Sequence, residues 1–233
     1  MNGIQVERVR VKNFDPARVR GLLFDVDGTL ADTDNDYVTS FARWVPSTDA
    51  AQRERTARRL VMAMETPGNA LLTLLDRVGL DTVLLRISER IGRVLNRAPA
   101  RAHPPVPGVP EMLARLQGRY LLAVVSARET AHVAVFLEQS GLGHYFDVVI
   151  GSDSCEYSKP FPDPVLRAAR DLGLHADECV MIGDTTVDIR AGRSAGAQTI
   201  GVLCGFGEAG ELLRCGADVL LASTADLLEL LQM

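Results

Sequence analysis

The fold of this chain is decided by residues 20–30, which read RGLLFDVDGTL. A glycine and three apolar residues lead directly into two aspartates, Asp25 and Asp27, with a single valine between them. A short apolar run that ends in carboxylates, glycine and threonine is typical of a buried strand that enters a tight loop. The pattern therefore predicts that Asp25 and Asp27 lie where a strand over 20–25 ends.

Five further apolar runs predict strands later in the chain. They lie at residues 120–126, 146–151, 178–183, 197–203 and 218–221. Amphipathic patterns between the runs predict helices. These helices cover residues 110–117, 129–140, 163–172 and 188–195. Strands that alternate with helices build a parallel sheet covered on both faces, so the predicted fold class is α/β with a Rossmann-like, doubly wound core.

Residues 32–107 interrupt this alternation. The segment contains no strand-like run, and its amphipathic spacing predicts helices instead. Those helices are expected over residues 33–45, 49–64, 68–78 and 81–95. A proline-rich stretch then forms a stiff connector back to the core. We therefore expect an α/β core of residues 1–31 and 108–233 with an inserted all-helical domain at 32–107. The first dozen residues are read as an edge strand of the core.

Composition restricts the classes of function. The chain has 233 residues, of which 47% are hydrophobic and 24% charged, and its net charge is -5. A mildly acidic chain does not predict a nucleic-acid or anionic-membrane partner. Its apolar runs are too short to span a bilayer, and the first dozen residues lack the apolar stretch of a signal peptide. The expected location is the cytoplasm. The four cysteines form no C-x-x-C pair, which indicates free thiols rather than a zinc site.

Polar residues gather where the predicted strands end, which is where ligands bind in parallel sheets. The four clusters are Asp25 with Asp27, Ser126-Ala127-Arg128, Ser158-Lys159-Pro160, and Asp184 with Asp188. Clustered carboxylate oxygens are ligands that suit Mg²⁺. A carboxylate can also attack phosphorus, and a neighbouring carboxyl can donate and accept the proton of the leaving oxygen. A hydroxyl, backbone amides and a lysine can hold phosphate oxygens. The clusters thus predict phosphoryl chemistry.

These four clusters, in this order along the chain, resemble the motifs of the haloacid dehalogenase-like superfamily, particularly its phosphoglycolate phosphatase-like branch. The resemblance implies a Mg²⁺-dependent phosphatase that hydrolyses a small phosphorylated metabolite through an aspartyl-phosphate. Residues 32–107 match the helical cap that this branch places just after its first motif. In this reading the cap selects the substrate.

The resemblance implies a role for each motif residue. Asp25 would be the nucleophile and Asp27 the general acid and base. Ser126, Ala127 and Lys159 would bind and orient the phosphoryl group.

The resemblance also implies a metal site. Mg²⁺ would be held by Asp25, the backbone carbonyl of Asp27 and Asp184, with Asp188 supporting these ligands from behind. Asp184 and Asp188 are equally explained as acids that a helix N-terminus favours.

The other motif residues have structural explanations too. Ser126 suits a helix cap, and an isolated lysine is usually a solvated surface charge. Lys159 is, however, one of two lysines among 25 basic residues and lies in a proline-rich loop, which favours a specific role. Arg128 is read either as a substrate contact or as a surface arginine. The glycine-rich stretch 205–210 is expected to be an ordinary connection.

Two other functions remain open at this stage. A phosphomutase resembling beta-phosphoglucomutases would use the same aspartyl-phosphate but return the phosphate to a sugar, although Thr29 stands where that pattern has an apolar residue. A binding protein on an inactive enzyme fold would normally lack one of the four clusters, and here all are present.

Overall fold

The computed structural model of the protein describes residues 14–33 and 103–231. The chain divides into two units, Met1–Thr33 with Ala102–Met233 and Asp34–Arg101, and the described residues all belong to the first. The predicted helical cap, apart from its two ends, and the predicted edge strand in the first dozen residues lie outside the described residues. Both remain predictions.

One parallel sheet organises the described residues. Its six strands follow the order β3-β2-β1-β4-β5-β6, and every pair of neighbours is parallel. The strands are β1 (Gly21–Phe24), β2 (Leu121–Val125), β3 (Val148–Ile150), β4 (Cys179–Gly183), β5 (Gln198–Val202) and β6 (Val219–Leu221). Each lies inside one of the six predicted runs. The prediction of a parallel α/β sheet is therefore confirmed.

Helices connect the strands. The four predicted helices are present as α4 (Val109–Leu116), α5 (Thr130–Gln139), α6 (Asp163–Asp171) and α7 (Thr186–Ala195). Two further helices were not predicted, α8 (Ala209–Cys215) and α9 (Leu227–Leu231). Short 3-10 turns complete the described elements, namely η1 (Pro16–Arg18), η2 (Gly143–Tyr145), η3 (Ala176–Glu178) and η4 (Thr224–Asp226). None of the described helices is long and apolar enough to cross a membrane.

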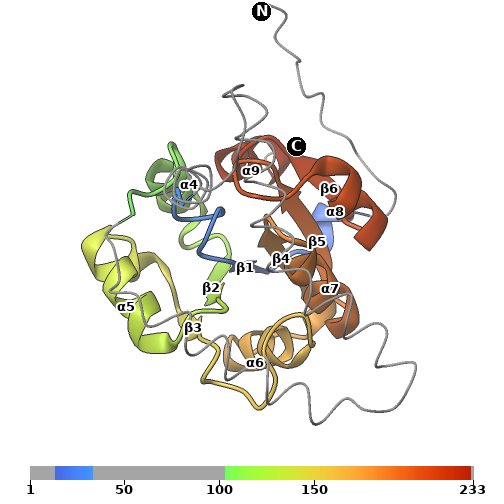
Figure 1. Ribbon diagram of the computed structural model, residues 1–233, viewed down its shortest axis with the longest axis horizontal. Coiled ribbons are helices and arrows are strands. Elements are labelled where there is room, and N and C mark those ends of the chain that lie inside the picture. The colour runs from blue at the N-terminus through green and yellow to red at the C-terminus, as the bar shows by residue number, and fades with distance from the viewer. Residues whose placement is uncertain (1–13, 34–102, 232–233) are drawn as a thin grey trace, which may run out of the picture. The chain divides into compact units, whose positions relative to one another are not determined.

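The side chains of β1 show why both faces of the sheet are covered. All four residues of the strand are buried. Leu22 and Phe24 pack into an apolar cluster with residues of α4, α5 and α9, whereas Leu23 packs into a second cluster with residues of α6 and α7. Alternate residues of a strand point to opposite faces, so each face needs its own helical layer. Figure 1 shows the two layers on opposite sides of the sheet, which confirms the doubly wound core.

The strand order brings the loops that follow β1, β2 and β4 together. β1 lies between β2 and β4, and Phe24 is in register with both Val124 and Ile182. Because the three strands are parallel, the residues that follow them emerge at the same edge of the sheet. This edge includes the point where strand order reverses, which is where ligands bind in open α/β sheets.

Candidate active site

Asp25 is the first residue after β1. Its backbone N–H donates to the carbonyl of Ile182 at 2.9 Å, so Asp25 continues the hydrogen bonding of the sheet, and the residue is buried with 7% of its surface exposed. The chain then turns sharply at Gly28, whose φ of +68° is a left-handed conformation that favours glycine. Asp27 lies inside this turn with a side chain that is 31% exposed.

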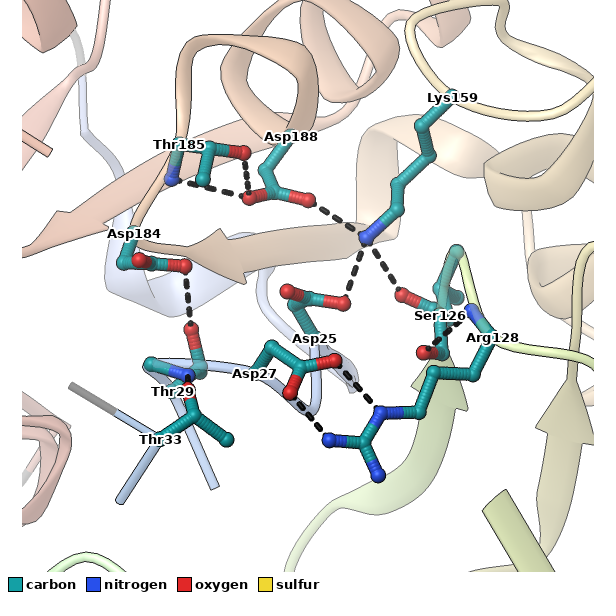
Figure 2. Close-up of polar contacts among 12 residues, drawn as sticks. Asp25, Asp27, Thr29, Thr33, Ser126, Arg128, Lys159, Asp184, Thr185 and Asp188 are labelled. Carbon is teal, nitrogen blue, oxygen red and sulfur yellow. Dashed lines mark hydrogen bonds and ion pairs between the residues drawn. The ribbon is translucent and has the colours of Figure 1, made fainter. Parts of the chain in front are cut away.

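Lys159 lies at the centre of the site. Its ammonium donates to Oδ1 of Asp25 at 2.7 Å and to Oδ1 of Asp188 at 2.6 Å (Figure 2). It also donates to the carbonyl of Val125 at 2.9 Å. Its side chain is only 2% exposed. A buried lysine with three oxygen acceptors is not a solvated surface charge, so the structural explanation of Lys159 from sequence is wrong.

Burial and neighbouring charges shift the titration of this pair. Burial raises the pKa of the Asp25 carboxyl to about 7; Lys159 acts in the opposite direction, and Asp188 and Asp27 add to the rise. Burial alone would lower the pKa of the Lys159 ammonium, but the Asp188 and Asp25 carboxylates outweigh it and hold that pKa above its usual value. The lysine is therefore charged, whereas the ionised form of Asp25 is destabilised by its burial and by the neighbouring carboxylates.

Asp188 has both of its carboxylate oxygens in use. Oδ1 accepts from Lys159, and Oδ2 accepts from the backbone N–H of Thr185 at 3.0 Å and from its hydroxyl at 2.6 Å. Thr185 immediately precedes α7, so Asp188 caps this helix and also orients Lys159. The structural explanation of Asp188 as a helix N-terminal acid is therefore correct, and it is compatible with a role in the site.

Asp184 is held by residues from two other loops. Its Oδ2 accepts from the backbone N–H of Phe206 at 2.8 Å, and the hydroxyl of Thr29 lies 3.4 Å from its Oδ1. Two glycines leave room for this carboxylate, because a Cβ atom would lie 2.3 Å from Oδ2 at Gly28 and 2.1 Å from it at Gly205. The stretch 205–210 is thus part of the support of the site, and the prediction of an ordinary connection was incomplete.

The carboxylates are suited to a divalent cation. One oxygen from each of Asp25, Asp184 and Asp188 lies within 4.8 Å of the others, and all three residues are buried. The Lys159 ammonium contacts the carboxylates of Asp25 and Asp188 but not that of Asp184, so one lysine charge serves a cluster of three carboxyl groups. Hard oxygen donors of this kind match Mg²⁺. Both oxygens of Asp188 accept short hydrogen bonds of 2.6 Å, whereas the Thr29 hydroxyl lies 3.4 Å from Oδ1 of Asp184 and the Lys159 contact uses Oδ1 of Asp25. Asp25 and Asp184 are therefore the better placed to hold the ion.

The second motif forms a fixed turn after β2. The backbone N–H of Ser126 donates to the carbonyl of Ile150 at 2.9 Å, and its hydroxyl oxygen accepts the backbone N–H of Arg128 at 3.1 Å. Ser126 is buried, whereas Ala127 between them is exposed at the loop. Ser126 therefore stabilises its own turn, and its hydroxyl hydrogen can be directed at a bound anion.

Arg128 is the residue whose role the sequence left most open. Its Nε donates to Oδ2 of Asp27 at 2.7 Å, and its terminal nitrogen donates to Oδ1 of the same carboxylate. Figure 2 shows this two-pronged pair beside Asp25. The Arg128 side chain is 15% exposed, so it belongs to the site and not to the open surface.

The fold, with its cluster of carboxylates at the carboxyl edge of a doubly wound sheet, is that of an α/β enzyme. The chain matches the family described as haloacid dehalogenase-like hydrolase over residues 22–202, and it belongs to that family. The resemblance seen in the four motifs, and with it the predicted class of hydrolase, is confirmed.

Similar proteins carry related names. The chain is 35% identical over 190 residues to a probable phosphatase, IndB, of Dickeya dadantii, which covers 79% of this chain and 81% of that protein. It is 32% identical over 225 residues to a phosphoglycolate phosphatase of Pectobacterium atrosepticum, covering 91% and 92%. These relatives agree with the predicted enzyme class, a phosphatase of this family.

Two solved structures are also similar to this chain over most of their length. A hydrolase from Pseudomonas syringae matches with a TM-score of 0.64 and 28% identity, over 91% of this chain and 98% of that chain. A putative beta-phosphoglucomutase from Thermotoga maritima matches with a TM-score of 0.61 and 25% identity, over 92% and 99%.

Proposed function

We propose that the protein is a Mg²⁺-dependent phosphatase that hydrolyses a small phosphorylated metabolite through an aspartyl-phosphate on Asp25. The observation that carries this proposal is the contact of a buried, charged Lys159 with Oδ1 of Asp25 at 2.7 Å. This contact fixes the direction of the carboxylate at the end of β1. A buried and oriented carboxylate whose negative charge is only partly balanced is suited to attack phosphorus once a cation and substrate are bound.

The proposed reaction has two displacements at phosphorus. In the first, a carboxylate oxygen of Asp25 forms a bond to phosphorus and the bond to the leaving oxygen breaks. Asp27, which must be protonated for this step, gives its proton to that oxygen. In the second, water attacks the phosphorus and passes its proton to Asp27, and the bond to Asp25 breaks. Inorganic phosphate and the dephosphorylated alcohol leave, and both aspartates return to their initial state.

The remaining residues hold the phosphoryl group and the cation. Ser126 and a backbone amide at Ala127 would bind phosphoryl oxygens. Lys159 would do so by exchanging one of the three acceptors that its ammonium now contacts. Asp25, Asp184 and the backbone carbonyl of Asp27 would hold Mg²⁺, and Asp188 would support them through Lys159. When bound, Mg²⁺ offsets the repulsion between carboxylates and phosphate and stabilises the charge transferred in the reaction.

The proposed substrate is a small metabolite monoester. Among the similar proteins, several are named phosphoglycolate phosphatase, which makes 2-phosphoglycolate the first compound to test. The proposed division of labour assigns chemistry to the core, 1–31 and 108–233, and substrate selection to the cap, 32–107. The test is phosphate release from a panel of phosphorylated metabolites with Mg²⁺ and with chelator. Release that is equal in the two conditions would contradict the proposal.

A phosphomutase is the second candidate, favoured by the structural similarity to the putative beta-phosphoglucomutase. The two functions share the first displacement and differ in whether water or a sugar hydroxyl accepts the phosphoryl group. Incubation with a hexose 1-phosphate separates them. Free phosphate supports the phosphatase, and an isomerised sugar phosphate without free phosphate supports the mutase.

A further inference from the structure

Arg128 and Asp27 form a pair that the proposed reaction cannot use as it stands. Both carboxylate oxygens of Asp27 accept hydrogen bonds from the Arg128 guanidinium. The proposed reaction, on which this inference rests, requires an Asp27 oxygen to meet the leaving oxygen of the substrate. Asp27 must also carry a proton there, and a neutral carboxyl cannot keep two charged hydrogen bonds to the guanidinium, so the pair must open when substrate binds.

The turn that carries Arg128 holds the backbone of this residue beside the site, so its guanidinium stays within reach when the pair opens. The backbone N–H of Arg128 donates to the Ser126 hydroxyl at 3.1 Å, and its carbonyl accepts the N–H of Ser152 at 2.9 Å. One residue before Ser126, the Val125 carbonyl binds the Lys159 ammonium that also contacts Asp25. The backbone of Arg128 is thus fixed by the same segment that contacts the proposed nucleophile through Lys159.

The chemistry of the guanidinium identifies the new partner. A planar guanidinium binds a carboxylate and a phosphoryl group with the same two-pronged geometry. An incoming phosphoryl group brings at least one negative charge to a place beside the Asp27 carboxylate, which repels it. Moving Arg128 from Asp27 to the phosphoryl oxygens relieves this repulsion and leaves Asp27 accessible.

From these contacts we infer that Arg128 is a substrate-binding residue that is held on Asp27 until a phosphoryl anion replaces Asp27 as its partner. Binding of the anion and exposure of Asp27 to the leaving oxygen are then one event. The Asp27 carboxylate and the phosphoryl group compete for Arg128.

A binding cycle with inorganic phosphate tests this competition without relying on turnover. Phosphate affinity is measured by calorimetry with Mg²⁺ present for the wild type, Arg128→Ala, Asp27→Asn and the double variant. With Asn at position 27 the competitor is removed, so losing Arg128 should weaken phosphate binding by about tenfold, the value of a charged hydrogen-bonded pair. With Asp27 present, losing Arg128 should weaken phosphate binding by no more than about threefold, because breaking the Arg128–Asp27 pair offsets part of the attraction between Arg128 and phosphate.

Two controls define the result. Arg128→Lys keeps the charge but loses the two-pronged geometry. Its losses of phosphate affinity should be smaller than those of Arg128→Ala, and again larger with Asn at position 27 than with Asp27. Arg167→Ala removes an arginine that is paired with Asp171 on an exposed helix face, and should leave phosphate affinity unchanged. All variants are checked for cooperative unfolding.

The outcomes separate this inference from the proposed function. A larger loss with Asn at position 27 than with Asp27 supports the exchange. Equal losses in the two backgrounds, or a larger loss with Asp27, would show that Asp27 does not compete with the phosphoryl group for Arg128 and would contradict the exchange. A wild-type protein that binds no phosphate in the presence of Mg²⁺ would contradict the phosphatase proposal itself, and the exchange with it.

Discussion

Asp25 is the residue whose replacement should cost the most activity. Asp25→Asn keeps the shape of the side chain, but its amide cannot form the bond to phosphorus. We expect kcat to fall at least about 1000-fold, equivalent to about 4 kcal/mol of barrier. Steady-state kinetics with a metabolite and with an aryl phosphate measure the change. A variant that keeps activity within about tenfold of the wild type would exclude Asp25 as the nucleophile.

Asp25 should also make the stability of the metal-free protein depend on pH. Its pKa of about 7 in the fold lies above the usual 3.8, so the folded protein holds this proton more tightly than the unfolded chain. The resulting stabilisation is complete below pH 3.8 and is lost as the pH rises through about 7. In chelator, the free energy of unfolding of the wild type should decrease over this range by roughly 1–4 kcal/mol more than that of Asp25→Asn.

Urea unfolding of both proteins across this pH range measures the difference. Saturating Mg²⁺ should reduce it, because a bound cation favours the ionised carboxylate. Identical pH profiles for the two proteins in chelator would show that the fold does not raise the pKa of the Asp25 carboxyl.

Lys159 provides the third prediction at this scale. Its ammonium lies within 3 Å of three oxygen acceptors in a buried position, where a planar guanidinium is too large and has a different geometry. We expect Lys159→Arg to lower kcat at least about 100-fold, although the charge is conserved. The exposed Arg170→Lys is the matched control and should leave kcat unchanged. Wild-type kinetics for Lys159→Arg would remove Lys159 from the site.

At the scale of elements, the loop after β1 is shaped around Asp184. Gly28→Ala would place a Cβ atom 2.3 Å from the Asp184 carboxylate in addition to straining the backbone at φ +68°. We expect this variant to lose at least about tenfold in Mg²⁺ affinity, because it displaces a proposed ligand. Gly118 has a similar φ of +78°, but a Cβ atom added there would have no atom within 4 Å.

Gly118→Ala therefore separates backbone strain from displacement of the carboxylate. It should lose about 1 kcal/mol of stability and keep its Mg²⁺ affinity. Calorimetric titration with Mg²⁺ measures both variants. Equal affinities in Gly28→Ala and Gly118→Ala would contradict the proposed role of Asp184.

The elements that sequence predicted are those with a local pattern. All six strands could be predicted because each lies in a short apolar run, and the inner strands β1 and β4 are buried along their whole length. Helices α8 and α9 were missed because seven and five residues are too few to show a period of 3.6. Local pattern thus determined the layers of the core but not its short final helices.

The site was predictable to the same extent. The loops after parallel strands must meet at one edge, so the positions of Asp25, Ser126 and Asp184 followed from the strands. The pairing of side chains could not be predicted from the strands. Arg128 meets Asp27 across 101 residues of sequence, and the amide of Phe206 meets Asp184 across 22. Such pairs depend on packing in three dimensions, for which the sequence has no local signal.

At the scale of the whole molecule, the core and the proposed cap should be separable in function. The proposed phosphate-handling residues all lie outside 32–107, so this segment should change the preferred substrate and not the chemistry. The test replaces residues 32–107 with the matching segment of the phosphoglycolate phosphatase of Pectobacterium atrosepticum, which is 32% identical to this chain. We expect at least about a tenfold change in preference for 2-phosphoglycolate over other metabolites, or about 1.4 kcal/mol.

Hydrolysis of a small aryl phosphate serves as the control for that exchange. Its leaving group needs little help, so its Mg²⁺-dependent rate should stay within about tenfold of the wild-type rate. A folded chimaera that has lost this reaction would show that the segment contributes to the chemistry itself.

The most direct test of the central claim is chemical identification of the phosphorylated residue. The enzyme is mixed with substrate and Mg²⁺, quenched in acid within one turnover, and treated with borohydride, which reduces an acyl phosphate to an alcohol. Peptide mass spectrometry then locates the reduced side chain. We predict reduction at Asp25 alone, dependent on both substrate and Mg²⁺. Reduction at another residue, or none during a measured burst of product, would contradict an aspartyl-phosphate on Asp25.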